Sequence, residues 1–219
     1  MKNANKILGI LNRRYRVKPH RGKPFRVLIG CLLSHRTKDE TTWPSTNRLF
    51  SVANTPQKML KLSEKRIARV IYPVGFYNQK AKRIKQICRI LLKQFNGKVP
   101  KTREELMELP GVGGKTADIV LSYAYGRAVI AVDTHVAKIA QRLGWSKQKE
   151  PEKIRADLHK LIPPSKRIIV NHLLVSFGKD VCQSRKPLCY KCPIEELCPY
   201  PNKTPKPKGT LKPEEGTIG

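Results

Sequence analysis

Apolar residues recur three and four positions apart along most of the chain, which is the spacing of one face of an α-helix. Two stretches show this spacing most clearly: Ile84, Ile87, Cys88, Leu91, Leu92 and Phe95, and then Ile119, Val120, Tyr123 and Ala124. Alternation of apolar and polar residues, the mark of a half-buried strand, is not convincing anywhere. The pattern therefore predicts an all-α fold with helices of about three turns.

Start signals divide this pattern into separate helices. Thr55, followed by a proline, has the form of an N-cap before a first-turn proline. Thr37 with Glu40, and Thr102 with Glu105, have the spacing of a capping box. Short connections rich in glycine, proline and asparagine are predicted between the helices.

The charge of the chain points to a polyanionic partner. It has 45 Lys and Arg against 16 Asp and Glu, a formal net charge of +29, which excludes an ordinary neutral domain. Two stretches without any acidic residue, 1–38 and 65–103, hold many of the basic side chains. Because such a charge repels itself unless an acidic partner absorbs it, nucleic acid is the expected partner, and the two stretches are predicted to line one phosphate-binding cleft.

The longest apolar runs, such as 27–33, are far shorter than the roughly 18 residues of a membrane-spanning helix. The apolar patch at 7–11 is followed at once by Arg13 and Arg14, which does not fit a secretion signal. We therefore expect no membrane association, no secretion signal and a reducing compartment. If the source is prokaryotic, this is the cytoplasm, with the protein associated with the nucleoid.

A glycine-rich segment separates two predicted helices, 102–109 and 115–125. It reads Leu109-Pro110-Gly111-Val112-Gly113-Gly114-Lys115. The proline ends the first helix, and the glycines bring bare backbone amides to the surface where the second begins. Such amides form an anion site, here for a DNA phosphate. An ordinary turn between helices is the alternative, although three glycines around one valine exceed what a turn requires.

This segment, followed by Val132-Asp133-Thr134-His135-Val136, resembles the helix-hairpin-helix and Gly/Pro-rich-loop-Asp signature of the endonuclease III family of DNA glycosylases. The resemblance extends from about Phe25 to Cys198. It implies a bilobal helical fold with DNA across the interdomain groove, a damaged base flipped into a pocket, and a C-terminal cysteine-ligated cluster loop. We expect a helical barrel domain at 20–127 containing the helix-hairpin-helix at about 102–125, a cluster domain formed by 1–19 and 128–200, and a flexible Lys/Pro-rich tail at 201–219.

Lys115 lies in the first predicted turn of its helix, where the helix dipole disfavours a further cation. A nucleophilic role would require its pKa to fall by roughly two to three units, about 3–4 kcal/mol. From the residues alone, a phosphate contact is an equal alternative. The resemblance implies the catalytic role, in which a neutral amine attacks the sugar C1′, expels the base and leaves a Schiff base that undergoes β-elimination.

Asp133 follows an apolar run and precedes a helix predicted to begin near Thr134, so an N-cap is one interpretation. The resemblance implies a catalytic role, which is compatible with capping. Transfer of a proton from Lys to Asp is uphill by roughly 9 kcal/mol from ordinary pKa values. We therefore expect Asp133 to act first by stabilising developing positive charge and only second by shuttling protons.

Four cysteines fall close together with the spacing C-x6-C-x2-C-x5-C: Cys182, Cys189, Cys192 and Cys198. The spacing itself allows a tetrahedral zinc or an iron-sulfur cluster. The resemblance implies a [4Fe-4S] cluster with a structural or redox-sensing role. Cys31 and Cys88 lie on apolar stretches and are expected in the core.

Two further segments resemble the family loops that open the duplex. In the first, which includes His35 as a predicted DNA contact, Arg36 stands where a glutamine is usual and would fill the gap left by the flipped nucleotide. In the second, Phe76 would wedge into the base stack, the alternative being a core aromatic. His135 fits a packed helix residue or a pocket residue equally.

The resemblance implies a monomeric bifunctional DNA glycosylase and abasic-site lyase. Its substrates would be oxidised or ring-saturated pyrimidines in duplex DNA, and no divalent metal would be needed for catalysis. One rival is a relative specialised for mismatches such as thymine opposite guanine, which Lys115 disfavours because such relatives usually lack this lysine. The other is a non-catalytic metal-cluster module that binds DNA without cutting it.

Overall fold

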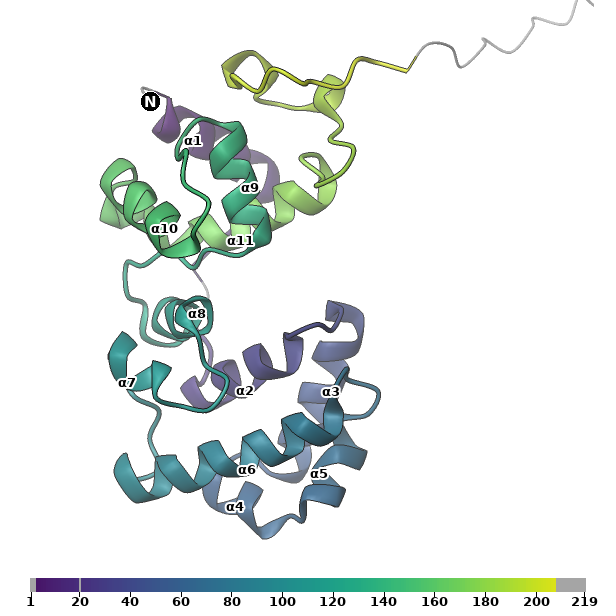
Figure 1. The fold of residues 1–219 in the computed structure, drawn as a ribbon, viewed down its shortest axis with the longest axis vertical. Coiled ribbons are helices and arrows are strands. Elements are labelled where there is room, and N and C mark those ends of the chain that lie inside the picture. Colours follow the sequence, from purple (N-terminus) through teal and green to yellow (C-terminus); the bar gives the residue numbers. More distant parts are fainter. Residues whose placement is uncertain (1–2, 20, 208–219) are drawn as a thin grey trace, which may run out of the picture.

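The computed structural model describes residues 3–19 and 21–207, and this part of the chain is all-helical (Figure 1). No β-strand occurs among these residues, so the predicted all-α fold is confirmed. The helices are α1 (Ala4–Tyr15), α2 (Pro24–Ser34), α3 (Asp39–Val52), α4 (Pro56–Lys61), α5 (Glu64–Ile71), α6 (Tyr77–Gln94), α7 (Arg103–Met107), α8 (Gly114–Tyr125), α9 (Thr134–Arg142), α10 (Pro151–Leu161) and α11 (Pro164–Asp180), with 3-10 turns η1 (Cys189–Lys191) and η2 (Glu195–Leu197).

The helices form two groups, each around its own apolar core. The first group, α2 to α8, buries Leu32, Ile84 and Val120 completely. The second group is α1 with α9 to α11, and it buries residues such as Leu11 and Phe177. Figure 1 shows α8 at the junction of the two groups. Helix α1, although first in the chain, packs on α11 near its end.

Local signals set most helix boundaries as predicted. The Thr55 hydroxyl accepts a hydrogen bond from the Lys58 amide at 3.2 Å and caps α4. The Thr102 hydroxyl accepts from the Glu105 amide at 3.3 Å and caps α7. On α6, the predicted apolar positions from 84 to 91 all face the first core.

The predicted capping box at Thr37 is wrong. Helix α3 begins at Asp39 without a side-chain cap. The Thr37 hydroxyl instead donates to the His35 carbonyl at 3.2 Å and accepts from the Gly75 amide at 3.2 Å. It also accepts from the Lys80 ammonium at 3.2 Å. Partners distant in the sequence have replaced the local cap.

A buried carboxylate joins the two groups. Asp118 on α8 is only 1 % exposed and accepts from Arg103 Nε of α7 at 3.2 Å and from Arg155 Nε of α10 at 2.8 Å. Burial raises the pKa of Asp118, while the charges of the two arginines oppose that rise. A second link runs from Lys179 of α11 to Asp39 of α3, at 2.5 Å. The groups are therefore tied on both sides of α8.

Within the described residues, none of the helices has the combination of length and apolar character needed to cross a bilayer. The predicted tail is described only as far as residue 207, and positions 208–219 lie outside the described residues.

His159 provides a test of packing in the second group. Its Nε2 atom accepts from the Ile130 amide at 3.1 Å, and burial together with Arg155, Arg167 and Arg103 lowers its pKa to about 4. In the unfolded chain His159 has its ordinary pKa of about 6.5. Between about pH 4 and about pH 6.5 the imidazole is therefore protonated in the unfolded chain and neutral in the folded one. Native stability from this group is therefore lost as the pH falls from about 6.5 towards about 4.

We expect His159→Gln, whose amide oxygen can still accept from Ile130, to remove this pH dependence. Between about pH 7.5 and about pH 5.5 the wild type should lose about 1 kcal/mol more unfolding free energy than the variant, measured by urea denaturation. An equal loss in both proteins would show that His159 does not titrate differently on folding.

Candidate functional site

The glycine-rich hairpin joins α7 to α8, and its three glycines differ in backbone conformation and in the space around their Cα atoms. Gly111 has a left-handed φ of +78°, which a glycine adopts without strain. An added side chain at Gly114 would collide with the paired Arg103 and Glu152 side chains. Only at Gly113 would an added Cβ meet open space, and there the bare backbone faces outward.

Val112 anchors this hairpin in the first core, where it is 6 % exposed. The hairpin is therefore held rigidly while the backbone around Gly113 stays accessible. Gly113 is also the N-cap of α8, so the first-turn amides of that helix lie beside it. Accessible amides at a helix start suit an anion.

Lys115 lies in the first turn of α8 with its side chain exposed. The loop before α3 packs beside it, because His35 Nε2 and Thr116 Oγ1 are 3.1 Å apart. Burial lowers the pKa of His35, and the charges of Lys115, Lys80 and Arg83 lower it further. His35 is consequently neutral near pH 7, and the start of α8 is surrounded by positive charge.

Asp133 is the N-cap of α9. Its Oδ1 atom accepts from the Val136 amide at 2.8 Å, and no ion pair holds its carboxylate among the described residues. The segment before it is fixed from α11, because Asn171 Nδ2 donates to the Ala131 carbonyl at 2.9 Å. Asp133 is therefore a rigidly placed, half-buried carboxylate.

Tyr123 connects this segment to α8. Its hydroxyl donates to Asn171 Oδ1 at 3.0 Å, and burial raises its pKa, with smaller contributions from the charges of Cys31 and Asp133. Helix α8 thus carries Lys115 at its start and, two turns later, Tyr123, whose pKa is raised in small part by the charge of Asp133.

A cavity of about 230 Å³ lies between α2, α3 and α8. Cys31 lines it together with Tyr123. Burial raises the pKa of Cys31, and the charge of Lys115 opposes that rise. Neither Lys115 nor Asp133 lines the cavity itself, but Tyr123 links its wall through Asn171 to the segment that precedes Asp133. Ser34, Asp39, Thr42 and Trp43 also line it. Cys31 is thus a cavity residue and not the core residue predicted, whereas Cys88 is fully buried.

Arg36 and Phe76 lie together at the tips of two loops. Both side chains are exposed, with left-handed φ values of 52° and 58°, and the guanidinium carbon lies 5.6 Å from the ring centre. The alternative of a core aromatic at Phe76 is excluded by its 54 % exposure. His135, by contrast, packs against α11, where an added Cβ at Gly178 would lie 2.5 Å from its Nδ1 atom.

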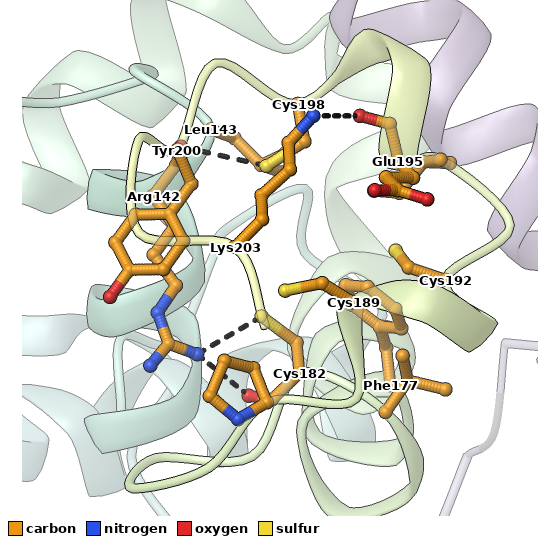
Figure 2. A pocket seen from close by; sticks show the side chains of 13 residues that line it. Arg142, Leu143, Phe177, Cys182, Cys189, Cys192, Glu195, Cys198, Tyr200 and Lys203 are labelled. Atoms are coloured by element: carbon orange, nitrogen blue, oxygen red, sulfur yellow. Dashed lines mark hydrogen bonds between the residues drawn. The ribbon is translucent and has the colours of Figure 1, made fainter. Parts of the chain in front are cut away.

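The four cysteines of the C-terminal loop line one pocket (Figure 2). None of them forms a disulfide bond. Arg142 Nη1 donates to Cys182 Sγ at 3.2 Å, and burial raises the pKa of Cys192 to about 11. Among the described residues, no three His, Cys, Asp or Glu side chains converge closely enough to hold a single metal ion.

Residues after the last cysteine close this loop. The Cys189 amide donates to Thr204 Oγ1 at 3.1 Å, and Lys203 Nζ donates to the Glu195 carbonyl at 2.8 Å. Tyr200 lies with its ring centre 4.9 Å from the Arg142 guanidinium carbon. The beginning of the predicted tail is therefore part of the cysteine loop.

Sequence reasoning missed Lys80, Tyr123 and Asn171 as residues that shape this site. Lys80 carried a usable signal, since it lies four positions before Ile84 on the apolar stripe of α6. Asn171 carried none, because its two partners come from α8 and from the segment before α9.

The model of the HhH-GPD superfamily of base excision DNA repair proteins matches residues 29–164. Endonuclease III of Thermotoga maritima is 44 % identical over 80 % of this chain and 82 % of its own length. Endonuclease III of Escherichia coli is 41 % identical over 90 % of this chain and 96 % of its own length.

Solved structures of DNA glycosylases are also similar to this chain in fold. A trapped covalent intermediate of endonuclease III with DNA has a TM-score of 0.84 at 33 % identity, covering 91 % of this chain and 95 % of that one. A thermostable thymine-DNA glycosylase has a TM-score of 0.81 at 28 % identity, covering 90 % and 93 %. The chain belongs to the HhH-GPD superfamily and, within it, to the endonuclease III family.

Proposed function

We propose that this protein is a bifunctional base excision repair enzyme, a DNA glycosylase with abasic-site lyase activity. The observation that carries the proposal is that α8 carries Lys115, exposed in its first turn, and Tyr123, which lines the cavity and is hydrogen-bonded to the Asn171 that fixes the segment before Asp133. The membership in the endonuclease III family supports it, and a solved member of that family was trapped in a covalent complex with DNA.

The reaction begins at the Lys115 amine in its neutral form. The amine attacks C1′ of the damaged nucleotide, the C1′–N bond breaks, and the base departs with the bonding electron pair and takes up a proton. The nitrogen then loses a proton and its lone pair forms the C1′=N bond, while the C1′–O4′ bond of the sugar ring breaks and O4′ takes up a proton, which gives the Schiff base. The Schiff base acidifies the C2′ hydrogen. Loss of that proton breaks the C3′–O bond and cuts the strand on the 3′ side by β-elimination.

Asp133 acts on the charge that develops during the first step. Its fixed carboxylate stabilises the positive charge that builds on the sugar as the base leaves. The N-cap bond to Val136 engages Oδ1 and keeps the carboxylate oriented in advance. No divalent metal takes part.

The DNA-binding surface combines positioning with insertion. The backbone at Gly111, Val112, Gly113 and Gly114 holds one phosphate without reading sequence, and the exposure of Gly113 supports this. Arg36 fills the gap left by the flipped nucleotide and Phe76 wedges into the stack. His35 supports the loop of Arg36 through its contact with Thr116.

The substrates are oxidised or ring-saturated pyrimidines in duplex DNA. The flipped base enters the cavity near Cys31 and Tyr123. There Ser34, Thr42 and Asp39 offer polar groups to a pyrimidine whose ring is no longer aromatic. The enzyme acts as a monomer and, if the source is prokaryotic, in the cytoplasm in association with the nucleoid.

Removal of a mismatched base, such as thymine opposite guanine, by a glycosylase is the second candidate function. The similarity to the thymine-DNA glycosylase favours it. The backbone fold does not separate the two, because both solved relatives superpose well. Lys115 favours the bifunctional enzyme, since a Schiff base needs an amine at this position.

We also propose a [4Fe-4S] cluster held by Cys182, Cys189, Cys192 and Cys198. Their placement around one pocket, without disulfide bonds, supports it. The cluster fixes the loop structurally, and the exposed Arg185 and Lys186 of that loop contact DNA phosphates. The two apolar cores support the division into a barrel domain at 20–127 and a cluster domain at 1–19 plus 128–200.

Activity is tested on duplexes carrying thymine glycol, a thymine–guanine mismatch or an abasic site. We expect strand scission at the first and third, and a covalent adduct when borohydride is present. Lys115→Ala should reduce scission and trapping to background, because the nucleophile is gone. Lys147→Ala, an exposed lysine between α9 and α10, is the matched control and should behave as wild type. Trapping of Lys115→Ala at the wild-type level would exclude the assignment.

Asp133→Asn separates catalysis from capping. Asparagine is as good an N-cap as aspartate, so the unfolding free energy should change by less than about 0.5 kcal/mol. Loss of the negative charge should slow single-turnover base excision by about 10²- to 10³-fold. Asp133→Ala should in addition lose about 1 kcal/mol of stability. Full excision by the asparagine variant would leave Asp133 with the capping role only.

Metal and sulfide analysis tests the cluster. We expect about four iron and four sulfide per chain, with broad visible absorption. Cys189→Ser should lower the iron content, whereas Cys31→Ser, which lies outside the loop, should keep it. One zinc per chain without sulfide would contradict the cluster.

A further inference from the structure

Lys80 is a buried cation without an acidic partner. It lies on α6 with 4 % of its surface exposed, and none of the ion pairs among the described residues includes it. An isolated buried charge is costly unless hydrogen bonds compensate it. The hydrogen bonds that offset the cost of burying the Lys80 ammonium group therefore show which part of the chain this side chain holds in place.

All three ammonium protons have acceptors in one loop. Lys80 Nζ donates to the Leu33 carbonyl at 2.8 Å, to the His35 carbonyl at 2.6 Å and to the Thr37 hydroxyl at 3.2 Å. A protonated lysine has three donors, so this loop satisfies it completely. Burial, and to a smaller extent Arg83, lower the pKa of Lys80 to about 8, so the amine is mostly protonated at pH 7.

The Lys80 side chain reaches the second loop through Thr37, the third acceptor of its ammonium group. The Thr37 hydroxyl accepts from the Gly75 amide at 3.2 Å, and a Cβ at Gly75 would lie 2.9 Å from the Arg36 carbonyl oxygen. The two loops therefore meet backbone to backbone, and the Lys80 side chain is linked to the second loop through the Thr37 hydroxyl.

Each loop ends in a strained residue. Arg36 and Phe76 both have left-handed backbones, at φ 52° and 58°, which residues with a Cβ adopt only where surrounding contacts hold them. The contacts that hold them here are those of Lys80, Thr37 and Gly75.

We propose that Lys80 is a positioning residue that couples the Arg36 and Phe76 loops into one rigid element, so that both side chains enter the duplex together. This inference rests on the proposed function. A neutral side chain of the same length would leave the carbonyls of Leu33 and His35 without their donor. The two tips would then move independently, and extrusion of the damaged nucleotide would become inefficient. An abasic site in single-stranded DNA needs no extrusion, so its cleavage by Lys115 should be spared.

The test compares Lys80→Met with a matched variant, Lys85→Met. Lys85 is on the same helix and also donates to two carbonyls, those of Leu60 at 3.0 Å and Leu62 at 2.6 Å, but in the turn between α4 and α5. Extrusion is followed by the fluorescence of 2-aminopurine placed beside thymine glycol in a duplex. Chemistry is followed by single-turnover excision, and by cleavage of a single-stranded abasic oligonucleotide.

For Lys80→Met we expect loss of the fluorescence change and duplex excision slower by between about 10- and 100-fold, with single-strand cleavage within about twofold of wild type. Lys85→Met should stay within about twofold in every assay. Thr37→Val, which removes only the hydroxyl between Lys80 and Gly75, should reduce extrusion in the same direction and guards against a folding defect in the methionine variant.

Wild-type extrusion by Lys80→Met and Thr37→Val would overturn the coupling. So would equal losses on duplex and single-stranded substrates, since these would show a general effect on the fold. If the wild type cleaves neither substrate, the proposed function fails. The coupling is then judged by fluorescence on an abasic duplex, where a signal lost in Lys80→Met supports it and an unchanged signal rejects it.

Discussion

The site depends on holding two separate apolar cores in one fixed orientation. Lys115 belongs to α8 of the first group, while Asp133 begins α9 of the second group. Neither core alone determines the separation between the amine and the carboxylate. That separation is set by the contacts of α8, above all by the buried Asp118 between Arg103 and Arg155. Removing one partner of such a buried arrangement typically costs about 3–5 kcal/mol, because it leaves an uncompensated buried charge.

The same helix satisfies a second demand, which is to bring positive charge to the DNA without destabilising the protein. Around the start of α8, burial lowers the pKa of His35, and the charges of Lys115, Lys80 and Arg83 lower it further. The excess charge of +29 is therefore not spread evenly as a solvated coat. Part of it is buried, and part covers the carbonyls of neighbouring turns, as Lys85 does. The basic side chains that remain exposed, apart from the nucleophile Lys115, are available to phosphates.

How much could be predicted from the sequence follows from how far apart the interacting residues are along it. The caps at Thr55, Thr102 and Asp133 were predictable because each bonds to an amide three residues away. Thr37 has the same local signal, yet its partners at Gly75 and Lys80 are about forty residues distant and replace the cap. Lys80 was counted among the DNA-facing cations because a basic residue gives no local sign of burial, apart from its place on an apolar stripe.

The loops that carry Arg36 and Phe76 show why a functional site departs from the rules that fix the rest of the chain. Both tips need an exposed side chain directed away from the core, and the left-handed backbone supplies that direction at a cost of roughly 1 kcal/mol each. Glycine would remove the strain but would also remove the exposed side chain that we propose enters the duplex. The structure uses a glycine one residue earlier, at Gly75, where the backbone of the other loop leaves no room for a Cβ. In these two loops the left-handed backbone thus falls on the two residues whose exposed side chains lie at the tips, and the hydrogen bonds of Lys80 and Thr37 lie beside them.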